Sequence, residues 1–162
     1  DCKRKSTIDF TRQSIGISMK NIDIEIHSKP ALTKTVVKTI VNEVSKIKDC
    51  RFSYLEISFV SKEIIHEINK EHLKHDFPTD IITFEYENSD EGIDGELIIC
   101  SEVAMENAER FEVSVESELL RLVIHGILHL IGYNDTEEET KRIMKSEEDR
   151  LVELLYPKLF II

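Results

Sequence analysis

Hydrophobic and polar residues alternate at the start of the patterned part of the chain. Isoleucines at 22, 24 and 26 are separated by polar residues, which predicts a strand over residues 21–27. From Leu32 to Ile47 the apolar residues recur every three or four positions, which predicts an amphipathic helix. Pro30 suits the first turn of a helix, so we expect this helix to begin near residue 30 and to end near residue 48.

The rest of the chain predicts three more strands and four more helices. Ser61, Ser101 and Ser114 are the expected helix N-caps, and Pro157 is expected to end the last helix. The predicted strands cover 51–60, 81–86 and 95–100, an acidic loop covers 87–94, and the predicted helices cover 61–72, 101–111, 114–131 and 136–156. We predict an α+β fold, in which a small mixed four-stranded sheet is covered by about five helices and the helix that starts at Ser114 packs centrally.

Composition indicates a single globular domain. We expect residues 19–162 to form it and residues 1–18 to be a poorly ordered or weakly packed lead-in. No apolar run approaches the roughly 20 residues that span a bilayer, and the basic start lacks the apolar segment of a signal peptide. Three widely spaced cysteines, Cys2, Cys50 and Cys100, indicate reduced thiols and a cytoplasmic protein.

The formal net charge of −11 argues against a generally basic surface for nucleic acid. A local basic groove remains compatible with this total, because binding follows the local field rather than the sum.

Two histidines lie four residues apart in an apolar, helix-prone segment. His125 and His129 would share one helical face, so that their ring nitrogens could bind one metal ion at about 2.0–2.1 Å. Gly132 is expected to end the helix and to let the chain turn back, which would bring Asp135 to the same ion. Three protein ligands with an open position are typical of a catalytic zinc site.

Each of these residues also has a simpler interpretation. A histidine in an apolar helix is often a packed residue with one hydrogen bond. Asp135 precedes Thr136, which could form a capping box with Glu139, so the aspartate could belong only to the start of the last helix. Glu138 or Glu139 could also supply the third ligand after a different turn.

Three ordered blocks carry a resemblance to a known family. The segment 125–133 reads His-Gly-Ile-Leu-His-Leu-Ile-Gly-Tyr, and it follows Pro-Thr-Asp-Ile-Ile-Thr-Phe at 78–84 and Gly-Glu-Leu-Ile-Ile-Cys at 95–100. Together they resemble the YbeY family, bacterial metal-dependent endoribonucleases of ribosomal RNA maturation. The likeness covers roughly residues 60–156.

The resemblance implies a set of site residues. His125 and His129 match two metal-binding histidines of the family, and Asp135 stands where the family has a third, so we expect one Zn²⁺ and leave another divalent metal open. The family's arginine for the RNA phosphate is replaced here by Leu73. Nearby, Lys70 and Lys74 are candidates for substrate binding, although a solvated helix end would look the same.

We expect the reaction to be hydrolysis of a phosphodiester. A divalent ion makes its bound water more acidic and neutralises charge on a phosphoryl oxygen. Asp80 is the candidate acid or base, although an aspartate at this position could equally cap a turn. The resemblance implies a single-strand-specific endoribonuclease that acts on small-subunit ribosomal RNA, at its 3′ end, and in ribosome quality control, with ribosomal RNA or the small subunit as its partner and no DNA or membrane.

Two other functions fit the same residues. One is a metallohydrolase for peptides or esters, but Gly126 stands where the His-Glu-x-x-His peptidases have their glutamate. The other is a ribosome-assembly factor without enzymatic activity, in which the metal ion is structural.

Overall fold

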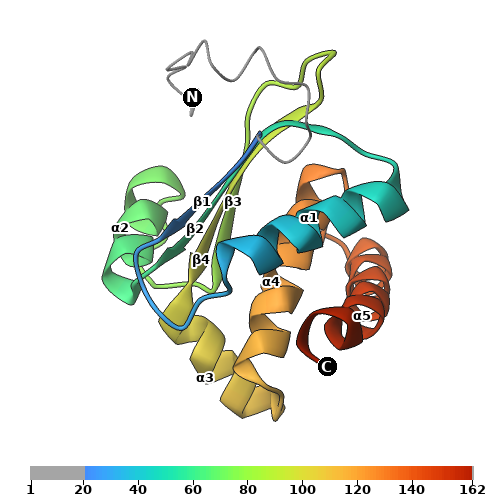
Figure 1. Cartoon of the computed structure of the whole chain (residues 1–162). Coiled ribbons are helices and arrows are strands. Elements are labelled where there is room, and N and C mark those ends of the chain that lie inside the picture. Colours follow the sequence, from blue (N-terminus) through green and yellow to red (C-terminus); the bar gives the residue numbers. More distant parts are fainter. Residues whose placement is uncertain (1–20, 162) are drawn as a thin grey trace.

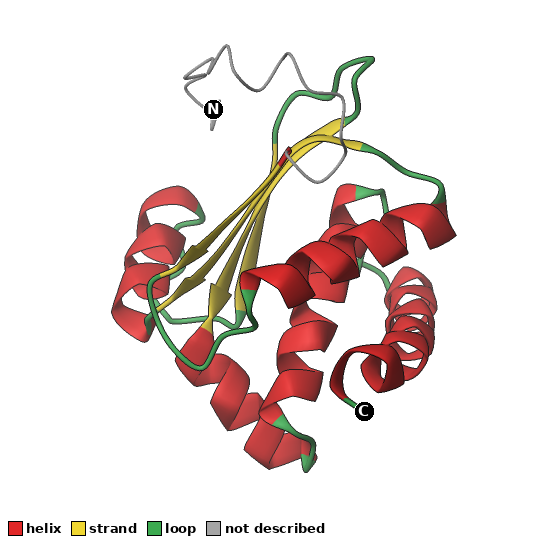
Figure 2. Cartoon of the chain, in the orientation of Figure 1, coloured by secondary structure: helices red, strands yellow, loops and turns green. Residues whose placement is uncertain are grey.

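A computed structural model describes residues 21–161, and the expectation for residues 1–18 lies outside this range. The described elements follow the predicted order of strands and helices (Figures 1 and 2). They are β1 (Ile22–Ile26), α1 (Lys34–Lys48), β2 (Phe52–Val60), α2 (Lys62–His72), β3 (Ile81–Glu85), β4 (Ile93–Cys100), α3 (Ser101–Phe111), α4 (Val115–Leu130) and α5 (Glu138–Phe160). The predicted α+β fold with a four-stranded mixed sheet and five helices is confirmed.

The four strands form one mixed sheet in the order β1-β2-β4-β3. β1 pairs with β2 and β2 pairs with β4 in parallel, whereas β3 runs antiparallel to β4 and forms one edge of the sheet. Figure 1 shows α1, α3, α4 and α5 on one side of the sheet and α2 on the other. His125 and His129 belong to α4, on the side that carries four helices, whereas Lys70 belongs to α2 on the other side (Figure 1).

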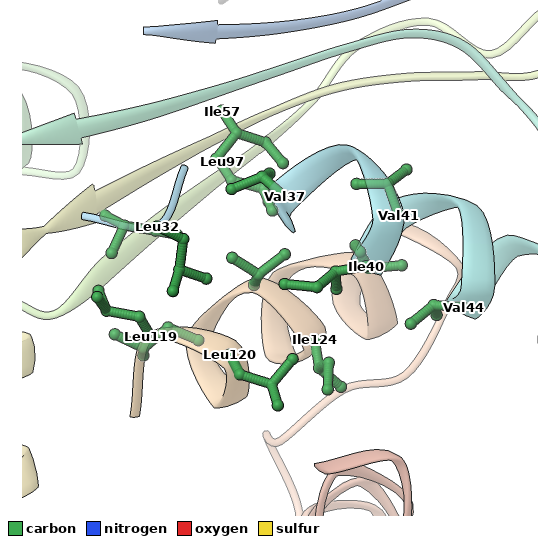
Figure 3. Packing of buried hydrophobic residues seen from close by; sticks show 14 of the residues in the cluster. Leu32, Val37, Ile40, Val41, Val44, Ile57, Leu97, Leu119, Leu120 and Ile124 are labelled. Carbon is green, nitrogen blue, oxygen red and sulfur yellow. The ribbon is translucent and has the colours of Figure 1, made fainter. Parts of the chain in front are cut away.

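The centre of the main core is α4. This helix contacts α1, α3, α5 and strands β3 and β4, which confirms the central position expected from the sequence. Its buried residues pack with the inward faces of α1 and the sheet (Figure 3). They include Leu119, Leu120, Leu122, Val123, Ile124, Ile127 and Leu128, each at most 1% exposed. A smaller apolar cluster lies under α2 on the other face.

A glycine sets how closely α4 approaches the sheet. A Cβ atom added to Gly126 would lie 2.5 and 2.7 Å from the two methyl carbons of Leu97 and 3.0 Å from that of Ile81. Real side chains do not pack at such distances, so a larger residue at this position would force Leu97 and Ile81 to shift. The close contact is made by the same helix that carries His125 and His129.

Two helix ends differ from the expectation. α1 begins at Lys34 rather than near Pro30, because Thr33 has extended backbone and its side chain accepts a hydrogen bond from the Val36 N–H at 3.2 Å. Pro157 does not end α5, which continues to Phe160. Leu159 and Phe160 pack against the main core, and this burial offsets the hydrogen bond that proline cannot donate.

Two smaller expectations at β4 are also wrong. The strand begins at Ile93, inside the predicted acidic loop, because Ile93 and Asp94 pair with β2. Ser101 does not cap α3. It is the first residue of the helix and fully buried, and Cys100 holds the cap position. Within residues 21–161, the Ser101 hydroxyl has no hydrogen-bond partner.

Two remaining expectations concern thiols and membranes. Cys50 and Cys100 are free thiols, as expected, and Cys2 lies outside the described range. Across residues 21–161, no helix combines the length and apolar character that crossing a bilayer requires.

Candidate metal centre

Two imidazoles and a carboxylate converge at the end of α4. His125 and His129 lie one turn apart on the helix, and their ring centroids are 4.9 Å apart. The Nε2 atom of His129 is 3.6 Å from Oδ2 of Asp135, which comes from the segment after the helix. Each of the three residues offers a ligand atom, and these atoms all lie within 4.8 Å of one another.

The geometry of this group suits a metal ion. Ligands held at about 2.0–2.2 Å by one ion lie roughly 3–4 Å from each other, so only a small side-chain rotation is needed here. Glu138 and Glu139, the alternative third ligands, belong to the first turn of α5 and are not members of the group. Two histidines and one carboxylate leave further coordination positions open for water and substrate.

A hydrogen-bonded turn brings Asp135 back toward the helix. The Tyr133 N–H donates to the Leu128 carbonyl at 3.0 Å, and the Gly132 N–H donates to the His129 carbonyl at 3.1 Å. This pair of bonds is the Schellman motif, which reverses the chain at a helix end. Gly132 has a φ of 114°, which a residue with a side chain rarely adopts, so a glycine is required at this turn.

Tyr133 anchors the turn to two other helices. The Lys48 ammonium at the end of α1 donates to the Tyr133 hydroxyl at 2.8 Å and lies 2.6 Å from the Glu147 carboxylate on α5. Hydrogen bonds from Arg150 lower the pKa of Glu147, partial burial opposes this, and Lys48 lowers it further, so that the pKa is about 2. The segment that carries Asp135 is therefore tied to α1 and α5 through charged groups.

The start of α5 differs from the capping box considered above. The box forms between Glu137 and Thr140, one residue later than the expected pair Thr136 and Glu139. Thr136 instead donates its hydroxyl to the Asn134 side-chain oxygen at 3.0 Å. Asp135 lies before the N-cap and is not part of the box, so its carboxylate remains available to the histidines.

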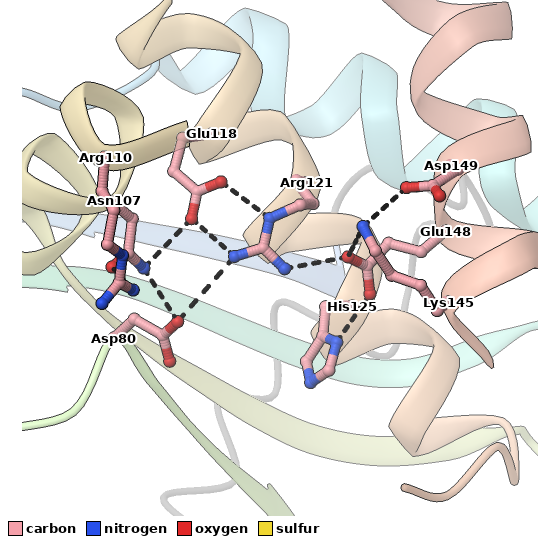
Figure 4. Close-up of polar contacts among 9 residues, drawn as sticks. All are labelled: Asp80, Asn107, Arg110, Glu118, Arg121, His125, Lys145, Glu148 and Asp149. Carbon is pink, nitrogen blue, oxygen red and sulfur yellow. Dashed lines mark hydrogen bonds and ion pairs between the residues drawn. The ribbon is translucent and has the colours of Figure 1, made fainter. Parts of the chain in front are cut away.

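A buried carboxylate contacts the Nδ1 atom of His125. The Glu148 Oε2 atom, on α5, lies 2.7 Å from Nδ1 of His125 (Figure 4). Arg121 donates to the second Glu148 oxygen at 2.8 Å and to Glu118 at 2.7 and 2.5 Å. Glu118 and Glu148 are only 1% and 2% exposed, so both depend on this arginine for charge balance.

The pKa values follow from this arrangement. Burial lowers the pKa of Arg121, but its bonds to Glu118 and Glu148 raise it by more, so the net pKa lies above the usual value. Burial raises the pKa of Glu148, but His125 and Arg121 lower it by more. Both groups are therefore charged at neutral pH.

Asp80 lies on the side of Arg121 that is opposite to His125. Its Oδ2 atom accepts a hydrogen bond from the Asn107 amide at 3.1 Å and lies 3.8 Å from Arg121. In Figure 4, Arg121 lies between Asp80 and His125. Asp80 is therefore connected to the metal-binding helix, and its side chain remains 30% exposed.

Lys70 and Lys74 lie apart from the three converging residues, at the end of α2. Both are exposed, and Leu73 between them is 43% exposed. The buried Asn69 holds the loop that follows, because its amide donates to the Phe77 carbonyl at 2.8 Å and its own carbonyl accepts from the backbone of residues 73 and 75. These hydrogen bonds to Asn69 fix the backbone of the loop that follows α2.

Sequence reasoning missed the network around Arg121. A signal was present for Glu148, because it lies in the apolar stripe formed by Met144, Leu151 and Leu155. A charged residue in such a stripe needs a buried partner. The partner comes from another helix, so the sequence pattern does not identify it.

The chain matches known proteins over most of its length. The model of the family described as "Endoribonuclease YbeY" matches residues 16–156. An endoribonuclease YbeY of Chlorobium phaeobacteroides is 38% identical over 130 residues, which cover 80% of this chain and 87% of that protein. Those of Parabacteroides distasonis and Flavobacterium psychrophilum are 37% and 34% identical and cover 78% and 85% of this chain, and 88% and 94% of their own lengths.

A solved structure has the same fold. The solution structure of TM1509 from Thermotoga maritima is similar with a TM-score of 0.63 and 30% sequence identity. The match covers 85% of this chain and 90% of that one.

The contacts of Glu147 predict an acid-dependent stability. Because its pKa in the folded protein is about 2, below the ordinary 4.5, the charged carboxylate stabilises the fold above about pH 4.5. This contribution is lost as the pH falls from 4.5 toward 2. Urea unfolding of metal-free protein between pH 5 and 2.5 should therefore show a shallower loss of stability for Glu147→Gln than for the unchanged protein.

The matched control is Glu153→Gln, an exposed position on the same helix, which should keep the full pH dependence. Parallel stability curves for Glu147→Gln and the unchanged protein would contradict the assignment.

Proposed function

The chain belongs to the YbeY endoribonuclease family, and we propose that it is a metal-dependent enzyme that cleaves single-stranded RNA. Its proposed substrate is small-subunit ribosomal RNA, with roles in 3′-end maturation and ribosome quality control in the cytoplasm. The observation that supports metal dependence is the convergence of His125, His129 and Asp135 within 4.8 Å.

The proposed metal is one Zn²⁺ ion, held by the two imidazoles and the carboxylate of Asp135. When bound, such an ion supplies a Lewis acid for the phosphoryl oxygen and makes water a better nucleophile at neutral pH. The carboxylate cancels one unit of the metal's charge, which a third imidazole would not do. The same donor set also suits other divalent metals, so we propose zinc on the basis of the two histidines.

Asp80 is proposed to transfer the proton. Asn107 holds its Oδ2 atom, while the side chain remains 30% exposed. An aspartate held through one oxygen has the other free for water or a leaving group. The nearby Arg121 keeps the local charge balanced.

Lys70 and Lys74 are proposed to contact RNA phosphates. They flank the exposed Leu73, the position where the family resemblance leads us to expect an arginine. The two lysines supply the positive charge that a leucine lacks. The side chains of His75 and Phe77 in the same loop are in ring contact at 5.3 Å, and Phe77 is 53% exposed. Exposed aromatic rings beside basic residues are typical of surfaces that bind single-stranded nucleic acid.

Removal of a histidine ligand tests the metal. His129→Ala should lose both bound zinc and RNA cleavage, measured by metal analysis and by hydrolysis of a labelled single-stranded RNA. Asp135→Ala should weaken zinc binding by about tenfold or more. The controls Glu138→Gln and Glu139→Gln should bind zinc as tightly as the unchanged protein, and full cleavage by metal-free His129→Ala would refute the mechanism.

Asp80→Asn tests proton transfer. The cleavage rate should fall by about 10²–10⁴-fold, the usual contribution of a general acid or base, while zinc content stays unchanged. The pH–rate profile should lose one limb. Asp90→Asn in the 87–94 loop is the control with the same charge change, and an unaltered rate for Asp80→Asn would exclude the role.

The double variant Lys70→Ser, Lys74→Ser tests the RNA surface. In zinc-free protein, which binds RNA without cutting it, the slope of log affinity against log salt should become shallower by about 0.7 per lost phosphate contact. Lys34→Ser, Lys38→Ser on α1 removes the same charge from the opposite side of the sheet and should leave the slope unchanged. Equal slopes in both double variants would disprove the contact.

A further inference from the structure

Glu148 occupies a costly position for a carboxylate. It lies on the buried stripe of α5 and is 2% exposed, although α5 contributes no residue to the three converging ligand atoms. One oxygen contacts Nδ1 of His125 at 2.7 Å, and the other accepts from Arg121 at 2.8 Å. A buried charge is retained only where its partners fully replace water.

We propose that Glu148 is a positioning residue that determines which ring nitrogen of His125 faces the metal. A charged carboxylate only accepts hydrogen bonds, so the Nδ1 atom beside it carries the proton. In the neutral ring, Nε2 then keeps its lone pair and is the atom that binds the ion. The metal-binding part of this inference rests on the proposed function, whereas the proton position does not.

The contacts behind Glu148 fix its orientation. Arg121 is itself held by two hydrogen bonds to Glu118, which also accepts from the Asn107 amide at 3.2 Å. Glu118, Arg121 and His125 lie on one face of α4, spaced by three and four residues, and Glu148 reaches this face from α5 (Figure 4). Glu148 therefore cannot rotate away from His125 without losing its contacts to His125 and Arg121 while it remains buried.

A purely structural role for the same contacts is the alternative. In that case, Glu148 would only join α4 to α5, as many salt bridges between helices do. The two roles differ in what they predict for the folded protein. A positioning residue changes the tautomer of His125 and the affinity for zinc, whereas a structural residue changes only the free energy of unfolding.

The test compares Glu148→Gln with Asp149→Asn. Each replaces a carboxylate by its amide on the same turn of α5, but Asp149 is 58% exposed and bonds to Lys145 instead of His125. A glutamine can donate as well as accept, so it no longer forces the proton onto Nδ1. The affinity for zinc, measured by competition with a chelator, should fall by about 10–100-fold in Glu148→Gln and stay unchanged in Asp149→Asn.

The tautomer itself is read from ¹⁵N chemical shifts of the imidazoles in metal-free protein, at a pH where the ring is neutral. The unchanged protein should carry the His125 proton on Nδ1, and Glu148→Gln should show a substantial population with the proton on Nε2. Urea unfolding of both variants gives the structural contribution separately.

Several outcomes would overturn the proposal. The first is that the unchanged protein carries the His125 proton on Nε2. The second is that Glu148→Gln folds with lower stability but keeps the same tautomer and the same affinity for zinc. If Glu148→Gln does not fold, the tautomer measured in the unchanged protein still tests the proposal. Failure of the unchanged protein to bind zinc would instead contradict the proposed function, and the tautomer measurement would remain valid.

Discussion

The close packing of α4 against the sheet is the constraint on which the site depends. A larger residue at Gly126 would meet the methyl carbons of Leu97 and Ile81, so the glycine lets the helix pack closely against β3 and β4. The packing of α4 in turn positions His125 and His129, which lie on the same helix. His125 and His129 are half-buried, with side chains that are 20% and 26% exposed.

Buried and half-buried charges of both signs lie along this helix, beside the candidate metal centre. Glu118 and Glu148 are buried, and a single arginine contacts both. Without Arg121, two buried carboxylates would lose their shared cation, which is a costly arrangement in a region of low dielectric. The net charge of −11 therefore says little about the local field at the site.

The two positions at which the sequence is expected to depart from the family pattern lie in different parts of the molecule. Asp135 lies on the turn that Tyr133, Lys48 and Glu147 fix to the rest of the protein. Because an aspartate side chain is shorter than a histidine, the position of this turn determines whether the carboxylate reaches His129. Leu73 instead lies at the exposed end of α2, where a change of side chain alters the surface without changing the core.

The sequence by itself determined the elements and part of the site. Period-two isoleucines gave β1, apolar residues at helical spacing gave α1 and α4, and the serines at 61 and 114 were correct caps because capping is a local interaction. The spacing of His125 and His129 likewise sets their common face without reference to the rest of the chain. The turn at Gly132 was predictable for the same reason.

Only the tertiary structure decided the contacts between elements that are far apart in the chain. Glu148 meets His125 across 23 residues, Lys48 meets Tyr133 across 85, and Asp80 meets Asn107 across 27. A pattern of hydrophobic and polar residues reports which face of a helix is buried, but it contains no information on which other helix covers that face. The incorrect end of α5 at Pro157 has the same cause, because packing of Leu159 and Phe160 outweighed the local preference of proline, whereas the start of α1 was set by the local cap at Thr33.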